Sequence, residues 1–172
     1  AEPDRQRVKK TLNQMVRVAN PLDYHTFGWG NAQALTATFT AMMATGFDLS
    51  LLVLDVPRQE RCCSDDWDQA LSAIKQASYA TQRPAAVVAT LPENLPESVA
   101  RALSTDGVAP MMGIDETLAA VEAAALIGRS YAQATPEPLV FFFNHTATTE
   151  NNRPTRLIDE ASAKSLLKAC GV

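Results

Sequence analysis

Apolar positions recur along this chain in two alternating patterns. Near the N-terminus, Val8, Leu12, Met15 and Val16 have the spacing of an amphipathic helix over about residues 4–16. Farther on, short unbroken apolar runs alternate with helical spacings, and such runs are typical of strands buried on both faces of a parallel sheet. The expected strands cover 49–56, 85–90 and 108–112, and the expected helices cover 31–46, 64–77, 96–107 and 115–126. Ser64 is the expected cap of the second helix, and the expected buried stripes are Trp67, Ala70, Leu71, Ile74 and Ala77 on that helix and Leu118, Val121, Ala125 and Leu126 on the last.

The alternation of strands and helices predicts parallel βαβ units in a doubly wound α/β sheet of four to five strands, with helices on both faces in three layers. Two shorter segments complete the expected sheet: Asn20–Asp23 as an extended piece at its start, and Leu139–Phe143 as an edge strand or a covering segment. Residues 1–143 are therefore expected to form one domain, and 144–172 a polar linker and one further helix. The abrupt start and end of the chain suggest a piece of a larger protein.

Composition narrows the function classes. The chain has 172 residues, 47% hydrophobic and 20% charged, with a net charge of −4, which is ordinary globular composition without the basic field of a nucleic-acid binder. No apolar run approaches the length of a membrane span. Three cysteines, two of them adjacent (Cys62, Cys63 and Cys170), form no zinc pattern with the two histidines, so no metal site is expected. Reduced thiols fit the cytoplasm.

The loop from Asn20 to Asn31 is the best candidate for chemistry, because ligands of open parallel sheets bind outside the carboxyl ends of the strands. Gly28 and Gly30 flank Trp29, and Asn31 is a suitable N-cap for the helix that follows. Backbone N–H groups at such a helix start bind phosphate or carboxylate. The alternative is that the two glycines only form a turn.

Other assignments find less support. His25 has no serine or cysteine at a dyad spacing and is interpreted as a hydrogen-bonding loop residue. Asp55 ends a strand, as the phosphoacceptor of a receiver domain does, but the acidic pair and the lysine of such domains have no counterpart. The loop only half supplies the Ser/Thr/Gly-rich phosphate loop of a flavin site, and nothing near Cys62 and Cys63 indicates a tuned thiolate.

Three stretches, in this order, carry a family resemblance. The first is Asn20-Pro21-Leu22-Asp23 with its glycine-bearing loop and a strand of the LLVLDVP type. The second consists of Asp106-Gly107-Val108-Ala109-Pro110-Met111 and then Gly113-Ile114-Asp115-Glu116-Thr117-Leu118. The third runs from Leu157-Ile158-Asp159-Glu160 to Gly171-Val172. Together they resemble the NDP-forming acyl-CoA synthetases, relatives of succinyl-CoA synthetase that include ADP-forming acetate–CoA ligases. The resemblance covers the second flavodoxin-like domain of that family (1–143) and the linker and first helix leading to its ATP-grasp region (144–172).

The resemblance implies a ligase that converts a carboxylic acid, coenzyme A and a nucleoside triphosphate into acyl-CoA, nucleoside diphosphate and phosphate through a phosphohistidine. The whole enzyme would use coenzyme A, ATP and Mg, whereas this fragment would hold no cofactor, no metal and no catalytic residue. It implies phosphate and acyl contacts at six positions: Asn20, Asp23, Gly28, Trp29, Gly30 and Asn31. His25 does not match the phosphohistidine motif.

The expected partners are the CoA-binding, phosphohistidine and ATP-grasp domains of the same enzyme and a carboxylic acid substrate, with neither nucleic acid nor membrane. The fragment is expected to be inactive alone. One departure is the filling of the loop: family members commonly carry more glycine there, whereas this chain has Tyr24, His25, Phe27 and Trp29. The alternative function is a non-catalytic flavodoxin-like interaction module.

Overall fold

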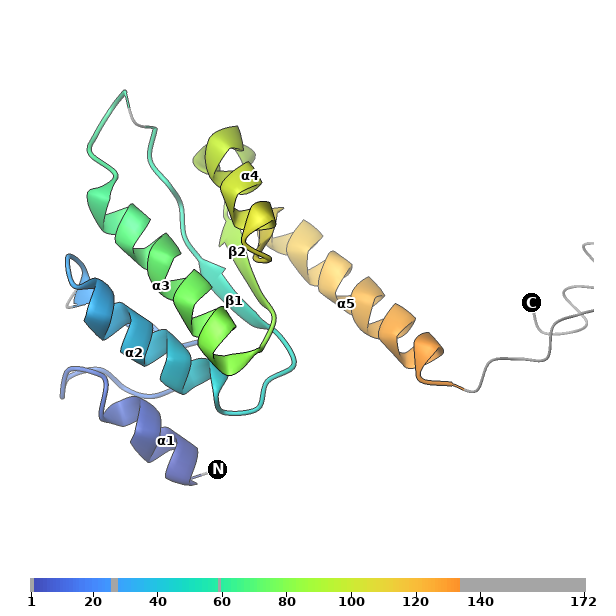
Figure 1. Ribbon diagram of the computed structural model, residues 1–172, viewed down its shortest axis with the longest axis horizontal. Helices are drawn as coiled ribbons and strands as arrows, with labels where there is room; N and C mark the ends of the chain where they lie inside the picture. The colour runs from blue at the N-terminus through green and yellow to red at the C-terminus, as the bar shows by residue number, and fades with distance from the viewer. Residues whose placement is uncertain (1, 26–27, 59, 134–172) are drawn as a thin grey trace, which may run out of the picture. The chain divides into compact units, whose positions relative to one another are not determined.

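The computed structural model describes residues 2–25, 28–58 and 60–133. Chain contacts divide the protein into two units, Ala1–Ala134 and Thr135–Val172, and all the described residues belong to the first. That unit is a mixed α/β structure in which helices pack beside a small parallel sheet (Figure 1). The expected edge strand at 139–143 and the expected linker and last helix at 144–172 lie outside the described residues. The domain boundary at residue 143 therefore stays a prediction.

The sheet has three parallel strands in the order β1-β2-β3: β1 Ser50–Val53, β2 Ala85–Ala89 and β3 Ala109–Met112. Leu52 pairs with Val87, and Val87 with Pro110. All five residues of β2 are buried, as expected of a central strand. The three main strands predicted from the apolar runs are thus confirmed, although the first is shorter than predicted. The Leu54 amide still donates to the Val88 carbonyl of β2 at 2.9 Å, but the Val56 amide donates to the Asn94 carbonyl, beyond the end of β2.

One face of the sheet carries the core. Helix α3 (Asp65–Thr81) connects β1 to β2, α4 (Glu97–Thr105) connects β2 to β3, and α2 (Ala32–Met43) lies alongside α3 (Figure 1). Because the strands follow one another in sequence order, right-handed connections place α3 and α4 on the same face. The buried cluster that results unites side chains of the sheet and all three helices or their flanks, among them Leu35, Phe39, Leu52, Val87, Leu71, Ile74 and Leu103.

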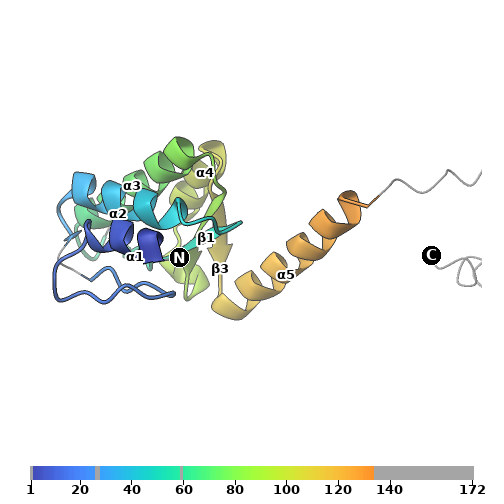
Figure 2. The ribbon, with the colours of Figure 1, turned by 90° about the horizontal axis from the view of Figure 1, so that it is seen from below.

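The helix after β3 is different. Helix α5 (Ile114–Tyr131) starts directly behind β3, and in both Figure 1 and Figure 2 it leads away from the sheet. Only Thr117, in its first turn, is buried. The sequence predicted Leu118, Val121, Ala125 and Leu126 as the inner side of this helix, yet Leu118 is 54% and Leu126 59% exposed. The prediction of a buried stripe on α5 is therefore wrong for the described part of the chain.

The N-terminal helix is shorter than its apolar spacing predicted. Helix α1 spans Glu2–Lys9, not 4–16, and Met15 is 83% exposed. The helix ends because local polar contacts replace its ladder: the Lys9 Nζ donates to the carbonyls of Gln14 and Val16 at 2.7 and 2.6 Å, and the Asn13 side chain accepts from the Met15 amide at 3.0 Å.

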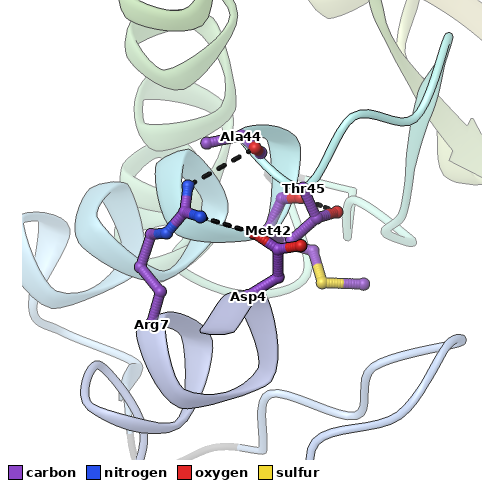
Figure 3. A network of polar contacts seen from close by, with 5 residues as sticks. All are labelled: Asp4, Arg7, Met42, Ala44 and Thr45. Atoms are coloured by element: carbon purple, nitrogen blue, oxygen red, sulfur yellow. Dashed lines mark hydrogen bonds and ion pairs between the residues drawn. The ribbon is translucent and has the colours of Figure 1, made fainter. Parts of the chain in front are cut away.

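Helix α1 is held against the C-terminal end of α2. The Arg7 guanidinium donates to the Ala44 carbonyl at 3.4 Å and pairs with Asp4, as Figure 3 shows. In the same view the Thr45 hydroxyl donates to the Met42 carbonyl at 2.7 Å. A cation at this position stabilises the negative end of the α2 dipole.

Two further expectations have a definite outcome. Asn20–Asp23 is not a strand; it is an irregular segment with a cis Asn20-Pro21 peptide bond. Ser64 precedes α3 as predicted, but its hydroxyl donates to the Asp68 carboxylate at 3.2 Å and does not cap the helix amides.

Among the described residues no helix combines the length and apolarity that crossing a membrane requires.

Candidate functional site

The predicted helix start at Asn31 is confirmed. The Asn31 Oδ1 accepts from the Ala34 amide at 2.9 Å, and the Asn31 carbonyl accepts from the Leu35 amide at 3.1 Å. The Asn31 amide itself donates to the Gly28 carbonyl at 3.1 Å. Helix geometry leaves the amides of Ala32 and Gln33 without an intrahelical acceptor, so these two point toward any anion at the helix start.

The two glycines of the loop have different reasons to be glycine. Gly30 has a φ of +74°, a left-handed conformation that side chains with a Cβ rarely adopt. A Cβ at Gly28 would approach the Leu35 side chain to 3.1 Å, so Gly28 permits the loop to lie close on α2. Both glycines therefore shape a tight entry into the helix.

An aromatic pair places this loop at the carboxyl end of the sheet. The rings of Trp29 and Trp67 meet edge to face with centroids 4.8 Å apart. Trp67 belongs to the first turn of α3, and α3 follows the carboxyl end of β1. The starts of α2 and α3 are thus neighbours at the end of the sheet where ligands of parallel α/β proteins bind.

The electrostatic surroundings of the loop are acidic. The first turn of α3 carries Asp65, Asp66 and Asp68, and a Cβ on Gly30 would lie 3.6 Å from the Asp66 carboxylate. This carboxylate opposes an anion at the start of α2, while the positive ends of both helix dipoles favour one. The balance of these effects sets how strongly phosphate binds there.

The six residues predicted as one site are not all brought together. Asn20 lines a hollow of about 390 Å³ with Met42, Thr45 and Phe47, which lie at and just after the C-terminal end of α2. The 12-residue α2 is about 18 Å long, and Gly30 and Asn31 stand at its other end. Only Gly28, Trp29, Gly30 and Asn31 form a continuous group.

Asp23 lies between these two ends and has a local role. Its carboxylate accepts from the His25 amide at 2.9 Å, a turn that holds His25 at a φ of +61°. The neighbouring Tyr24 ring meets Phe39 edge to face with centroids 5.2 Å apart. Burial, and secondly the charge of Asp23, raises the pKa of Tyr24 above its ordinary value. The aromatic side chain of Tyr24 therefore contributes to the core.

A polar cluster that the sequence analysis did not select sits beyond the ends of β1 and β2. Asp55 Oδ1 accepts from the Thr90 amide at 2.7 Å, and Oδ2 accepts from the Thr90 hydroxyl at 2.8 Å. Burial opposes ionisation of this carboxyl, but hydrogen bonds from Thr90, Asn94 and the Leu91 backbone outweigh it and lower the pKa of Asp55. The signal was available in the sequence, since both residues end an apolar run at the carboxyl side.

The remaining candidates have simple surroundings. Cys62 and Cys63 are exposed free cysteines. A hydrogen bond from the Asp65 backbone favours the Cys63 thiolate, but the Asp65 side chain, burial and the charges of Asp65 and Asp66 outweigh it and raise the pKa of Cys63. Within the described ranges, no three His, Cys, Asp or Glu side chains gather in a way that could hold a metal ion.

Comparison of the chain with protein-family models, with curated proteins and with solved structures finds no match. The observations on function are therefore the geometry of this edge of the sheet and the motifs of the sequence.

Proposed function

We propose that this chain is the second flavodoxin-like domain of an NDP-forming acyl-CoA synthetase, with the start of α2 contributing contacts to phosphate and to the acyl group. The observation that supports the proposal most is the position of Gly28–Asn31, a glycine-bearing loop at a helix N-terminus at the carboxyl end of a parallel sheet. In this proposal the complete domain is doubly wound, with four to five strands between two helical layers, and it acts in the cytoplasm.

The chemistry of such a site requires no nucleophile from this domain. A phosphoryl group carried on a histidine of another domain would approach the start of α2, where the amides of Ala32 and Gln33 and the helix dipole stabilise its oxygens. Trp29 is half-buried beside that position and supplies an apolar wall for an acyl group. Asn20 and Asp23 belong to the proposed motif but stand away from the helix start, so their contribution is to hold the loop.

The other domains would supply the remaining parts. Coenzyme A, ATP with Mg and the phosphohistidine belong to the partner domains of the enzyme, and the carboxylic acid binds where these domains meet this one. The coding sequence that adjoins this chain should then contain a Ser-His-Thr-Gly-type phosphohistidine loop on one side and an ATP-grasp segment on the other.

The direct test is an NMR titration of the chain with inorganic phosphate. The amides of Gly30, Ala32 and Gln33 should shift with saturation, whereas the amides of Ala44 and Thr45 at the opposite end of α2 should not. Gly30→Ala, which strains a residue at φ +74°, should weaken the response. Shifts confined to other parts of the chain would contradict the site.

A second candidate function rests on the aromatic packing of the loop. Tyr24 and Trp29 pack against the core, and both contact other aromatic rings. A loop filled in this way suits a non-catalytic module that docks other proteins. This function predicts no phosphate response at Gly30, so the same titration separates the two.

A further inference from the structure

The hollow beside Asn20 is a concave feature of the chain that the proposed phosphate contacts do not use. Its walls are helix α1, the irregular segment 17–20 and the C-terminal end of α2. Its volume of about 390 Å³ falls within the range of roughly 300–1,000 Å³ that small-molecule sites occupy. Three of its lining residues, Asp4, Met42 and Thr45, are drawn in Figure 3.

Two basic side chains build the hollow by turning the chain back along α1. The Lys9 Nζ donates to the Val16 carbonyl at 2.6 Å, which closes the turn after the helix. The Arg5 Nη2 donates to the Val18 carbonyl at 3.4 Å, so the returning segment lies beside α1. Helix α1 in turn contacts α2, and Val8 is its buried residue. The hollow is thus enclosed by segments that hold one another in place.

The lining combines apolar side chains with two cations. Apolar side chains come from all the walls of the hollow: Val8, Val18, Ala19, Met42 and Phe47. The cations are Arg5 and Arg17, of which Arg17 has no hydrogen bond or ion pair to any described residue. A guanidinium presents its N–H donors in a planar fork that matches the two oxygens of a carboxylate. The lining therefore suits a ligand with an apolar body and a carboxylate head.

The charges around the hollow favour an anion near the arginines. Residues 1–17 carry five basic and two acidic side chains, a net charge of +3, whereas the complete chain carries −4. Both acidic side chains are engaged, because Asp4 pairs with Arg7 and Glu2 accepts from the Gln6 side-chain amide at 2.9 Å. The negative end of the α2 dipole opposes an anion at the wall that α2 forms. A carboxylate is therefore favoured at the arginines, with its apolar tail toward α2.

We propose that this hollow binds an aliphatic monocarboxylate, with its head group on Arg5 and Arg17 and its carbon chain against Val18, Met42 and Phe47. The size of the hollow sets the length of the chain. A cavity of about 150 Å³ accommodates benzene, a ring of six carbons. A hollow of about 390 Å³ therefore accommodates a chain of roughly eight carbons together with its carboxylate.

The proposed carboxylate site is separate from the proposed phosphate site. Gly30 and Asn31 stand at the N-terminal end of α2, whereas Met42 belongs to its last turn, about 18 Å away. A ligand in the hollow does not reach the amides at the helix start. The proposal therefore does not rest on the proposed ligase function, and each of the two can fail without the other.

The test is an NMR titration of the 172-residue chain with sodium octanoate. The amides of Arg17, Val18 and Ala19 and the methyl group of Met42 should shift with saturation, at a dissociation constant of about 1 mM or below. Butanoate should bind at least about ten-fold more weakly, because its shorter chain buries fewer CH₂ groups. Octylammonium, with the same chain and the opposite charge, should give no saturating shift at these residues. No saturating shift with octanoate, or shifts confined to the exposed apolar residues of α5, overturns the proposal.

Exposed variants separate the head-group contact from non-specific binding. Arg17→Gln should weaken octanoate at least about five-fold, because it removes a charge-assisted hydrogen bond. Arg17→Lys keeps the charge without the fork and should lose less. Ala19→Glu places a carboxylate in the lining and should abolish the saturating shifts.

Arg83→Gln is the matched control, since it removes one positive charge in the turn between α3 and β2 and should leave octanoate binding unchanged. Arg17, Ala19 and Arg83 are all exposed, so unchanged circular dichroism is expected for every variant. Octanoate binding that survives both Arg17→Gln and Ala19→Glu overturns the proposal. So does a loss that Arg83→Gln produces to the same extent as Arg17→Gln.

Discussion

Thr90 donates to both carboxylate oxygens of Asp55, through its amide at 2.7 Å and its hydroxyl at 2.8 Å. The two residues follow neighbouring parallel strands, so this pair of hydrogen bonds ties the carboxyl ends of β1 and β2 together. The same bonds lower the pKa of Asp55 against the opposing effect of its burial. The carboxylate is therefore part of the frame that positions the edge of the sheet.

Asp55→Asn should destabilise the fold in a pH-dependent way. Since the folded pKa is below the unfolded value near 3.9, the stabilisation is fully present above about pH 4 and is lost as the pH falls through the folded pKa. We expect a loss of about 1–2 kcal/mol at pH 7, because the group is partly exposed, and a smaller loss near pH 3. Urea unfolding at both pH values measures it; equal losses would contradict the role of the charge.

Thr90 offers a matched pair of variants for the same contact. Thr90→Val removes the hydroxyl donor and keeps the shape, and should cost about 1 kcal/mol at pH 7. Thr90→Ser keeps the donor and should retain most of the pH dependence. If both variants behave alike, packing and not the hydrogen bond holds the two strand ends.

Asn31→Ala should shorten or destabilise α2. The side chain accepts from the Ala34 amide at 2.9 Å, and loss of such a cap costs about 1 kcal/mol. Asn31→Asp keeps the acceptor and adds a negative charge at the positive helix end, so its stability should match that of the natural chain. The urea midpoints of the natural chain, Asn31→Ala and Asn31→Asp test this expectation, with Asn31→Asp as the control.

Asp66→Asn should strengthen phosphate binding at the start of α2. The carboxylate stands beside Gly30, and removing one like charge at this distance near the surface is worth about 0.5–1 kcal/mol, or roughly two- to five-fold in affinity. Asp48→Asn makes the same change in net charge at the amino end of β1 and should have little effect. Phosphate titrations followed at the Gly30 amide compare the variants; an equal gain in both would indicate only a net-charge effect.

Cys63 should alkylate slowly at neutral pH. The raised pKa keeps Cys63 in the thiol form. The acidic side chains of Asp65 and Asp66 contribute to this shift, and both can be replaced. With Cys62 and Cys170 replaced by serine, Asp65→Asn and Asp66→Asn should each raise the rate of reaction with iodoacetamide at pH 7.5. Mass spectrometry follows the reaction, and Asp48→Asn serves as the distant control. Unchanged rates in both variants would mean that access, not charge, limits the thiol.

The sequence patterns predicted those elements whose own chemistry determines them. The α3 stripe Ala70, Leu71, Ile74 and Ala77 is buried as its spacing indicated, and Asn31 caps α2 as its residue type indicated. Each of these features depends on contacts within a few helical turns. The C-terminal end of α1 was not predicted, because the Lys9 ammonium donates to carbonyls up to seven residues ahead, and the spacing of apolar residues carries no information on such a contact.

The candidate site shows a different limit. Asn20 and Asn31 are close in the sequence, but the chain between them runs the length of α2, so they end at opposite ends of that helix. The periodicity of α5 likewise predicted an inner side, of which the structure leaves Leu118 and Leu126 exposed. The pairing of Asp55 with Thr90 needed the strand order, which joins residues 35 positions apart.

Pro110 gives the outer edge of the sheet a property of its own. The Gly113 amide donates toward β2. Because backbone amides along a strand point alternately to its two sides, positions 110 and 112 face the other side of β3, which has no partner strand among the described residues. Proline has no N–H at that position, so an incoming strand would find one donor of the ladder missing. The edge of β3 is thereby a poor template for strand-by-strand aggregation, because a strand added there would lack one hydrogen bond of its ladder.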